Sequence, residues 1–81
     1  MAKPLAVGDG GMWIDLDECE EIGTRQGMLY KTKKGSWVLQ PSADSAGVEY
    51  KSAEAFKLLM QSGKFADAEK HFPEDYKKSQ L

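Results

Sequence analysis

Two runs of aromatic and aliphatic residues in the middle of the chain flank the turn-forming tripeptide Lys33-Lys34-Gly35. Short β-prone runs separated by a glycine-containing turn are typical of a β-hairpin. We therefore expect antiparallel strands over residues 27–33 and 36–40. This hairpin holds the densest apolar content of the chain and most of the basic cluster at residues 25–34, so the rest of the fold should be arranged around it.

The hairpin has two possible registers. A two-residue turn at Lys34-Gly35 would pair Tyr30 with Leu39, whereas a three-residue loop ending in a left-handed Gly35 would place Leu29 on the face of Leu39. Turn chemistry favours the three-residue loop, because a tight two-residue turn would force Lys34 to positive φ. In either register one strand carries apolar residues on both faces, and a single helix covers only one of them.

Residues 12–19 alternate between apolar and mainly acidic positions, which predicts another strand. Met12, Ile14 and Leu16 should face the core. Trp13 falls on the opposite face together with the acidic residues, which should face water.

Proline and glycine mark the segments expected to be irregular. Residues 1–11 are predicted to form a flexible arm, residues 20–26 a connection into the hairpin, and residues 42–47 a polar loop. The tripeptide Val48-Glu49-Tyr50 has the residue types of a short further strand.

Residues 53–62 have the strongest helical pattern in the chain. Ser52 is a suitable N-cap, Glu54 is an acid in the first turn, and Gly63 stands where a helix often ends. The apolar residues of this helix lie mainly on one side, which should pack on the hairpin.

A second, shorter helix is predicted over residues 64–72, with a narrow apolar stripe. Pro73 should stop this helix, and Glu74-Asp75 can begin a last turn after it. Residues 77–81 are predicted to form a flexible tail.

These elements predict a single α+β domain over residues 1–81. Its small antiparallel sheet has about three strands, packs against the first helix and is followed by the second, short helix. A chain of 81 residues buries roughly 60–65% of the surface that it exposes when unfolded. That leaves room for one small core, and a deep substrate cavity is not expected.

The formal net charge of -2 and the pI near 5.3 do not draw the chain towards nucleic acid. The charges are nevertheless separated. Acidic residues crowd positions 15–21, and basic residues follow at positions 25–34. Two such blocks neutralise each other where their segments pair.

The single cysteine, Cys19, excludes an intramolecular disulfide and fits a reducing compartment. The first residues contain no apolar stretch of the kind found in signal peptides, and no apolar run reaches the roughly 18 residues that a membrane span needs. We therefore expect a cytoplasmic protein without a membrane partner.

The residues needed for catalysis are sparse. His71 is the only histidine, and the acidic neighbours of Cys19 should raise the pKa of its thiol rather than activate it. Asp15 and Asp17 share one face of the predicted strand, but two carboxylates are too few ligands for a cation site. Zinc spacings and glycine-rich cofactor motifs are missing as well. We expect no enzymatic activity, no cofactor and no metal.

The hairpin region combines aromatic rings with positive charge, as strand-based readers of nucleic acid do. The candidate binding residues are Arg25, Tyr30, Lys31, Lys33, Lys34 and Trp37. Lysines at a hairpin tip, however, also keep ordinary soluble hairpins monomeric, and aromatic residues are usually part of the core. Nucleic-acid binding is therefore the alternative hypothesis.

The favoured hypothesis is a small protein-interaction module, such as an adaptor, inhibitor or regulatory subunit, whose partner is another protein. It rests on the exclusion of other functions and on the surplus of apolar residues around the hairpin. A homodimer formed through an open sheet edge or the second apolar face would use the same surplus.

The run LYKTKKGSWVL followed by EYKSAEAFKLLMQSG resembles the hairpin-then-helix pattern of small uncharacterised bacterial and phage proteins. The resemblance covers about half of the chain and rests on structural residue types, so it carries no functional residues over. It implies an origin in bacteria or mobile elements, where small domains of this kind can inhibit a host system.

Overall fold

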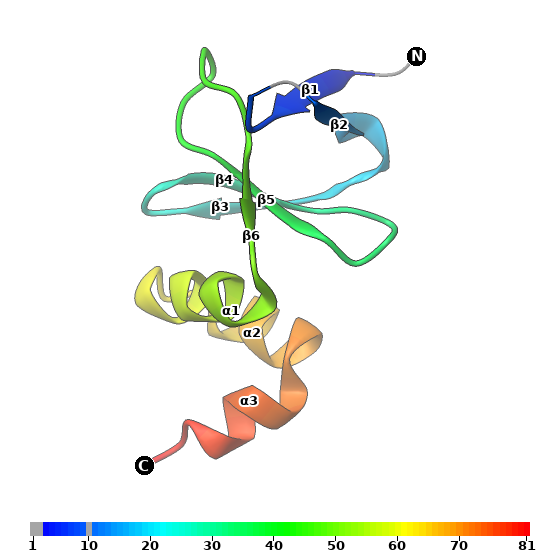
Figure 1. The fold of residues 1–81 in the computed structure, drawn as a ribbon. Coiled ribbons are helices and arrows are strands. Elements are labelled where there is room, and N and C mark those ends of the chain that lie inside the picture. The colour runs from blue at the N-terminus through cyan, green and yellow to red at the C-terminus, as the bar shows by residue number, and fades with distance from the viewer. Residues whose placement is uncertain (1–2, 10) are drawn as a thin grey trace.

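The structure is a computed structural model that describes residues 3–9 and 11–81. The chain forms three layers: an N-terminal hairpin, a four-stranded sheet and a group of helices (Figure 1). The N-terminal hairpin and the helices lie on opposite faces of the four-stranded sheet. The predicted α+β class is confirmed, but the predicted single sheet of about three strands is replaced by two antiparallel sheets of two and four strands.

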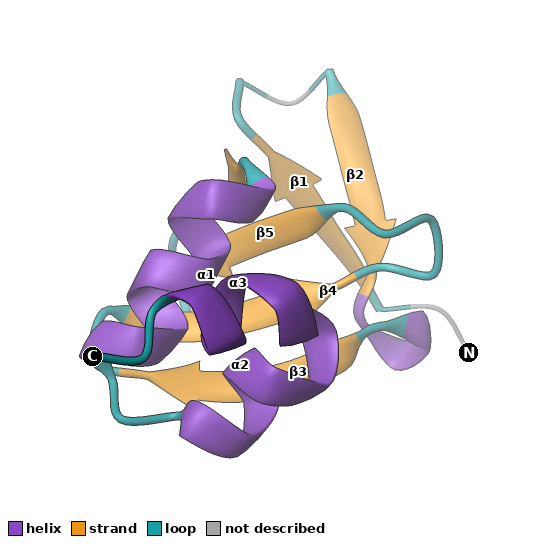
Figure 2. Cartoon of the chain, turned by 90° about the horizontal axis from the view of Figure 1, so that it is seen from below, coloured by secondary structure: helices purple, strands orange, loops and turns teal. Residues whose placement is uncertain are grey.

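The four-stranded sheet has the order β3-β4-β5-β6, with every neighbouring pair antiparallel. Its strands are β3 (Glu20–Thr24), β4 (Gly27–Lys31), β5 (Trp37–Gln40) and β6 (Val48–Tyr50). The short strand expected at residues 48–50 is thus confirmed. Figure 2 shows the helices packed across one face of this sheet.

The three-residue loop of the central hairpin is also confirmed. Leu29 pairs with Leu39, as that register requires. The Thr32 N–H donates to the Ser36 carbonyl at 2.9 Å, and the Gly35 N–H donates to the Thr32 carbonyl at 3.0 Å. Gly35 has φ 89°, a conformation that favours glycine.

The predicted connection over residues 20–26 is wrong, because most of it is β3. Ile22 is the only large apolar residue in this strand, so its own pattern is weak. Its order comes from pairing with β4 through a two-residue turn, in which the Gln26 N–H donates to Thr24 Oγ1 at 3.2 Å. Pairing with a neighbouring strand overrides weak local propensity here.

The predicted strand over residues 12–19 is also wrong in its second half. Strand β2 covers Met12–Asp15, and a 3₁₀ turn follows at Leu16–Glu18. The side-chain Oδ1 of Asp15 accepts hydrogen bonds from the backbone N–H groups of Lys3 and Asp17, both at 3.0 Å. A short carboxylate that bonds to nearby backbone favours a turn over a continued strand.

The flexible arm predicted over residues 1–11 does not hold for Pro4–Val7, which form β1 and pair with β2. Residues 1, 2 and 10 lie outside the described part of the chain. Leu5 and Val7 point into the protein and are buried. Gly47, which precedes β6, bonds to the other side of β1. Tertiary contact therefore orders a segment whose proline and glycines suggested an irregular arm.

Both predicted helices are confirmed to within one residue, as α1 (Ser52–Gln61) and α2 (Phe65–His71). The N-cap of α1 is Lys51 rather than Ser52, and the Lys51 N–H donates to the Glu54 carboxylate at 3.0 Å. Gly63 has φ 73° and ends α1 as predicted, with the Lys64 N–H donating to the Leu59 carbonyl at 2.9 Å.

Pro73 ends the predicted second helix and begins a third, α3 (Pro73–Lys78). Proline suits the first position of a helix because its missing N–H would have no partner there. Lys77 and Lys78, at the start of the predicted tail over residues 77–81, are the last residues of α3.

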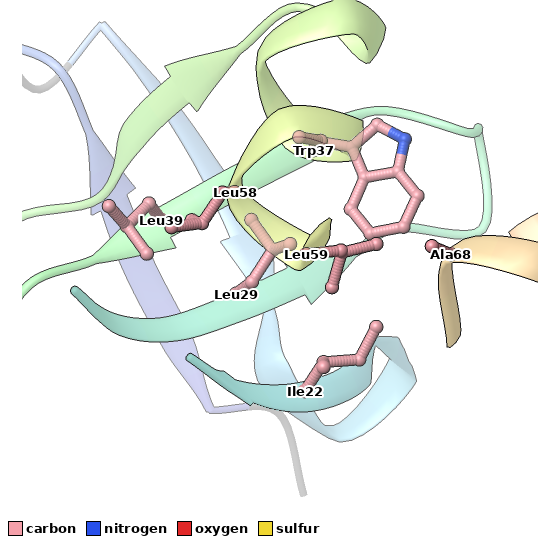
Figure 3. Packing of buried hydrophobic residues seen from close by; sticks show 8 residues of the cluster. Ile22, Leu29, Trp37, Leu39, Leu58, Leu59 and Ala68 are labelled. Atoms are coloured by element: carbon pink, nitrogen blue, oxygen red, sulfur yellow. The ribbon is translucent and has the colours of Figure 1, made fainter. Parts of the chain in front are cut away.

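Two apolar clusters lie on the two faces of the central hairpin. The helix-side cluster, shown in Figure 3, consists of Ile22, Leu29, Trp37, Leu39, Ala55, Leu58, Leu59 and Ala68. The cluster on the opposite face consists of Leu5, Val7, Tyr30 and Val38, with Ile14, Leu16, Cys19 and Met28 at its border. The face that α1 cannot cover is therefore covered by the N-terminal hairpin.

Candidate binding groove

The structure does not gather the six candidate binding residues into one surface. Tyr30 and Trp37 are 6% and 3% exposed and lie in different clusters. Arg25 lies in the turn between β3 and β4, where its N–H donates to Ser62 Oγ at 3.1 Å. Lys33 and Lys34 are exposed in the turn between β4 and β5, at the other end of β4. Neither aromatic ring is available to stack beside the basic residues.

Lys31 belongs to a structural cluster around the only histidine. Its Nζ lies 5.7 Å from the centre of the Trp37 ring and 3.2 Å from Nδ1 of His71. The other ring nitrogen of His71 lies 2.6 Å from a carboxylate oxygen of Glu20, and Lys70 donates to the second oxygen of that carboxylate at 2.9 Å. These contacts attach α2 to β3, β4 and β5.

A groove lies on the opposite side of the sheet, between β2 and the turn that joins β4 and β5. We call it the β2 groove, and its volume is about 390 Å³. It is lined by Val7, Met12, Trp13, Ile14, Asp15, Glu18, Cys19, Thr32, Lys33, Lys34, Ser36, Val38 and Glu49. Val7 and Val38 are buried and give the groove an apolar floor.

Two large apolar side chains at the groove face solvent. Met12 is 57% exposed and Trp13 is 62% exposed. Trp13 pairs with Ala6 and points to the face of β2 opposite Ile14, whereas Met12 pairs with Val7 at the first position of β2, on the same face as Ile14. Met12 is thus on the predicted face but is too exposed to belong to the core, whereas Ile14 and Leu16 do pack against the core. Adjacent exposed apolar residues beside a hollow are a recognised mark of interaction sites.

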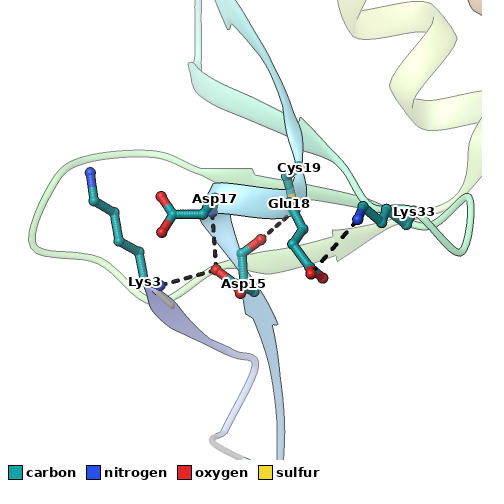
Figure 4. A network of polar contacts seen from close by, with 6 residues as sticks. All are labelled: Lys3, Asp15, Asp17, Glu18, Cys19 and Lys33. Atoms are coloured by element: carbon teal, nitrogen blue, oxygen red, sulfur yellow. Dashed lines mark hydrogen bonds and ion pairs between the residues drawn. The ribbon is translucent and has the colours of Figure 1, made fainter. Parts of the chain in front are cut away.

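The charges around the groove have both signs. Glu18 of the 3₁₀ turn forms an ion pair with Lys33 at 3.7 Å and so joins the two sides of the groove (Figure 4). Within the described residues, Lys34 and Glu49 form no ion pair. The carboxylate of Asp15 is already engaged by two backbone N–H groups. Lys34 and Glu49 are thus charged groups of the groove that have no ion pair within the described residues and can meet a ligand.

Cys19 lines the groove but is a poor nucleophile. Its Sγ donates to the Asp15 carbonyl at 3.2 Å. Burial, reinforced by the carboxylates of Asp15 and Glu18, raises the pKa of the thiol, as its acidic surroundings predicted. His71 packs edge-on against Trp37 on the helix side of the sheet. The two residues that could have formed a nucleophile–base pair therefore lie on opposite faces.

Sequence reasoning missed this groove as a site, although one signal pointed to it. The alternation of residues 12–19 placed Trp13 among the acids on the face expected to meet water. A large aromatic ring on a predicted solvent face is a candidate contact residue. The pattern alone did not reveal that the turn carrying Lys33 and Lys34 lies beside it.

Comparison with known proteins found no matching family model, no similar curated protein and no similar solved structure. The resemblance to small bacterial and phage proteins stays a prediction. Across residues 3–9 and 11–81, none of the helices has the length and apolar character needed to cross a membrane.

Proposed function

We propose that this chain is a non-enzymatic protein-interaction module, such as an adaptor, inhibitor or regulatory subunit, that binds a partner protein in the β2 groove. The observation that carries the proposal is the exposure of Met12 and Trp13 beside an apolar hollow of about 390 Å³. Solvent contact at two large apolar side chains is costly, and a partner that covers them recovers that free energy.

The separation of Cys19 from His71 supports a role without covalent catalysis. A single cysteine that forms no disulfide within the chain is consistent with the cytoplasmic location that we propose.

Protein is favoured over nucleic acid as the partner. Tyr30 and Trp37 are buried, so the basic residues of the hairpin have no neighbouring ring from that pair for base stacking. The exposed ring of Trp13 lies in a groove where three carboxylates (Asp15, Glu18 and Glu49) outnumber two lysines, which is not the basic surface that phosphate binding needs.

A capture experiment with matched variants tests the proposal. Wild type, Trp13→Ala and Phe65→Ala would be immobilised, incubated with lysate, and analysed for bound protein and nucleic acid. Phe65 is 50% exposed on α2, so Phe65→Ala removes an exposed aromatic ring far from the groove. Removing a central aromatic contact typically costs about 2 kcal/mol or more, or at least about thirtyfold in affinity.

We expect wild type and Phe65→Ala to retain the same partner, and Trp13→Ala to lose it. Equal retention by all three proteins would contradict docking in the groove. Recovery of nucleic acid that salt releases would instead favour the alternative hypothesis.

A further inference from the structure

The outer edge of β2 has backbone groups that point away from the protein. The Leu16 N–H donates to the Lys3 carbonyl at 2.9 Å, which places a hydrogen-bonded position just beyond the ends of β1 and β2, although the Lys3 N–H itself bonds to Asp15 Oδ1. Hydrogen-bonded and non-hydrogen-bonded pairs alternate along antiparallel strands. By this alternation Ile14 and Met12 also bond to β1. The N–H and C=O of Trp13 therefore point outward, and within the described residues they have no backbone partner.

The other strand edges are less suited to a partner. The free side of β1 is closed by Gly47, whose N–H and C=O bond to Ala6 and Gly8 at 2.8 Å. Strand β3 begins with Glu20 and Glu21, and charged residues protect an edge from pairing. Strand β6 has only three residues, one of them Glu49. By contrast, three of the four residues of β2 are large and apolar.

The β2 groove follows this edge. Its lining includes four consecutive residues, Met12 to Asp15, whose side chains alternate between the two faces of the hairpin. A groove lined by residues from both faces of the hairpin runs beside β2 rather than over one face of it. The opposite side of the groove is the turn containing Thr32, Lys33 and Lys34.

We propose that the partner contributes an extended segment that adds to β2 as a further strand. Its backbone would bond to the N–H and C=O of Trp13, and its alternate side chains would point into the groove towards Val7 and Val38. Large apolar residues fit those positions. Lys34, which has no ion pair within the described residues, favours an acidic residue near one end of the segment.

This inference rests on the proposed function, because it names the form in which the partner binds the groove. The probe is a library of random peptides displayed on phage and selected on the full chain. Recovered peptides would be synthesised with single N-methyl groups placed at each amide in turn. N-methylation removes a donor and blocks strand pairing on the side where the amide points.

Strand addition predicts that binding weakens by about tenfold or more at every second amide and changes little at the amides between them. In the complex, hydrogen exchange at the Trp13 backbone amide should slow by a similar factor. Lys34→Glu should weaken a peptide with an acidic end about threefold at low salt, whereas Lys57→Glu on α1 should not.

The remaining outcomes separate the two proposals. Peptides that need the Trp13 ring but show no two-residue period would overturn strand addition and leave the groove as the docking site. Binding that is indifferent to Trp13→Ala, or no selected peptide at all, would overturn both. A chain that sediments alone as a dimer, with its Trp13 amide protected, would show that a second copy occupies the edge instead.

Discussion

Truncation of Val38 to alanine tests whether the N-terminal hairpin covers the second face of the sheet. Val38 is 2% exposed and packs with Leu5 and Val7, the two buried residues of β1. If residues 4–7 were a flexible arm, Val38 would lie on an open sheet face and its truncation would cost little. The matched control is Val48→Ala, which makes the same change in the neighbouring strand, where the side chain is 48% exposed.

The expected loss follows from the buried groups that Val38→Ala removes. The two lost methyl groups, at about 0.8 kcal/mol each, account for about 1.6 kcal/mol of lost transfer free energy. The remaining cavity adds up to about 1 kcal/mol, so the free energy of unfolding should fall by about 2–2.5 kcal/mol. A domain of this size has about 4–12 kcal/mol in total, so the change is large. Both variants lose the same β-propensity, and the difference between them isolates burial.

Urea unfolding followed by far-ultraviolet circular dichroism measures both variants. Val38→Ala should lower the urea midpoint without changing the slope of the free energy of unfolding against urea, and in thermal unfolding its Tm should fall by about 10–15 °C. Val48→Ala should stay within about 0.5 kcal/mol of wild type. Equal and small losses in the two variants would show that β1 does not pack on Val38, and would refute the three-layer arrangement.

Three further predictions concern the turns, the pH dependence and the thiol. Gly27→Ala should lower the free energy of unfolding in urea by at least about 2 kcal/mol, because φ is +138° and the new Cβ would collide with the β5 backbone. Gly23→Ala, whose Cβ would meet open space, should cost under about 1 kcal/mol, and similar losses in the two variants would contradict this reasoning. Hydrogen bonding to Lys70 lowers the pKa of Glu20 below its usual 4.5. Wild type should therefore have a higher Tm than Glu20→Gln above that pH, and this difference in Tm should disappear as the pH falls through the lowered pKa. A Tm difference that is constant with pH would argue against the ion pair. Because the pKa of Cys19 is raised, iodoacetamide should alkylate the native chain more slowly at about pH 8 than the urea-unfolded chain, and equal rates would show an accessible thiolate.

Local sequence determined the elements whose signals are complete within a few residues. The loop Lys33-Lys34-Gly35 specified its own register, because only glycine adopts its positive φ at low cost. Gly63 and Pro73 placed the ends of α1 and α2 in the same way. The hairpin register also determined that Leu29, rather than Tyr30, shares a face with Trp37 and Leu39.

Only the tertiary structure decided what covers each side of the hairpin. Strands β1 and β3 have weak patterns of their own, and their order comes from pairing and burial against residues distant in the chain. The same packing buried Tyr30 and Trp37, which the sequence offered as binding residues, and left Trp13 exposed in the groove that Lys34 also lines. A side chain's residue type sets what it can bind, but its exposure depends on contacts between distant segments, and local periodicity does not encode those contacts.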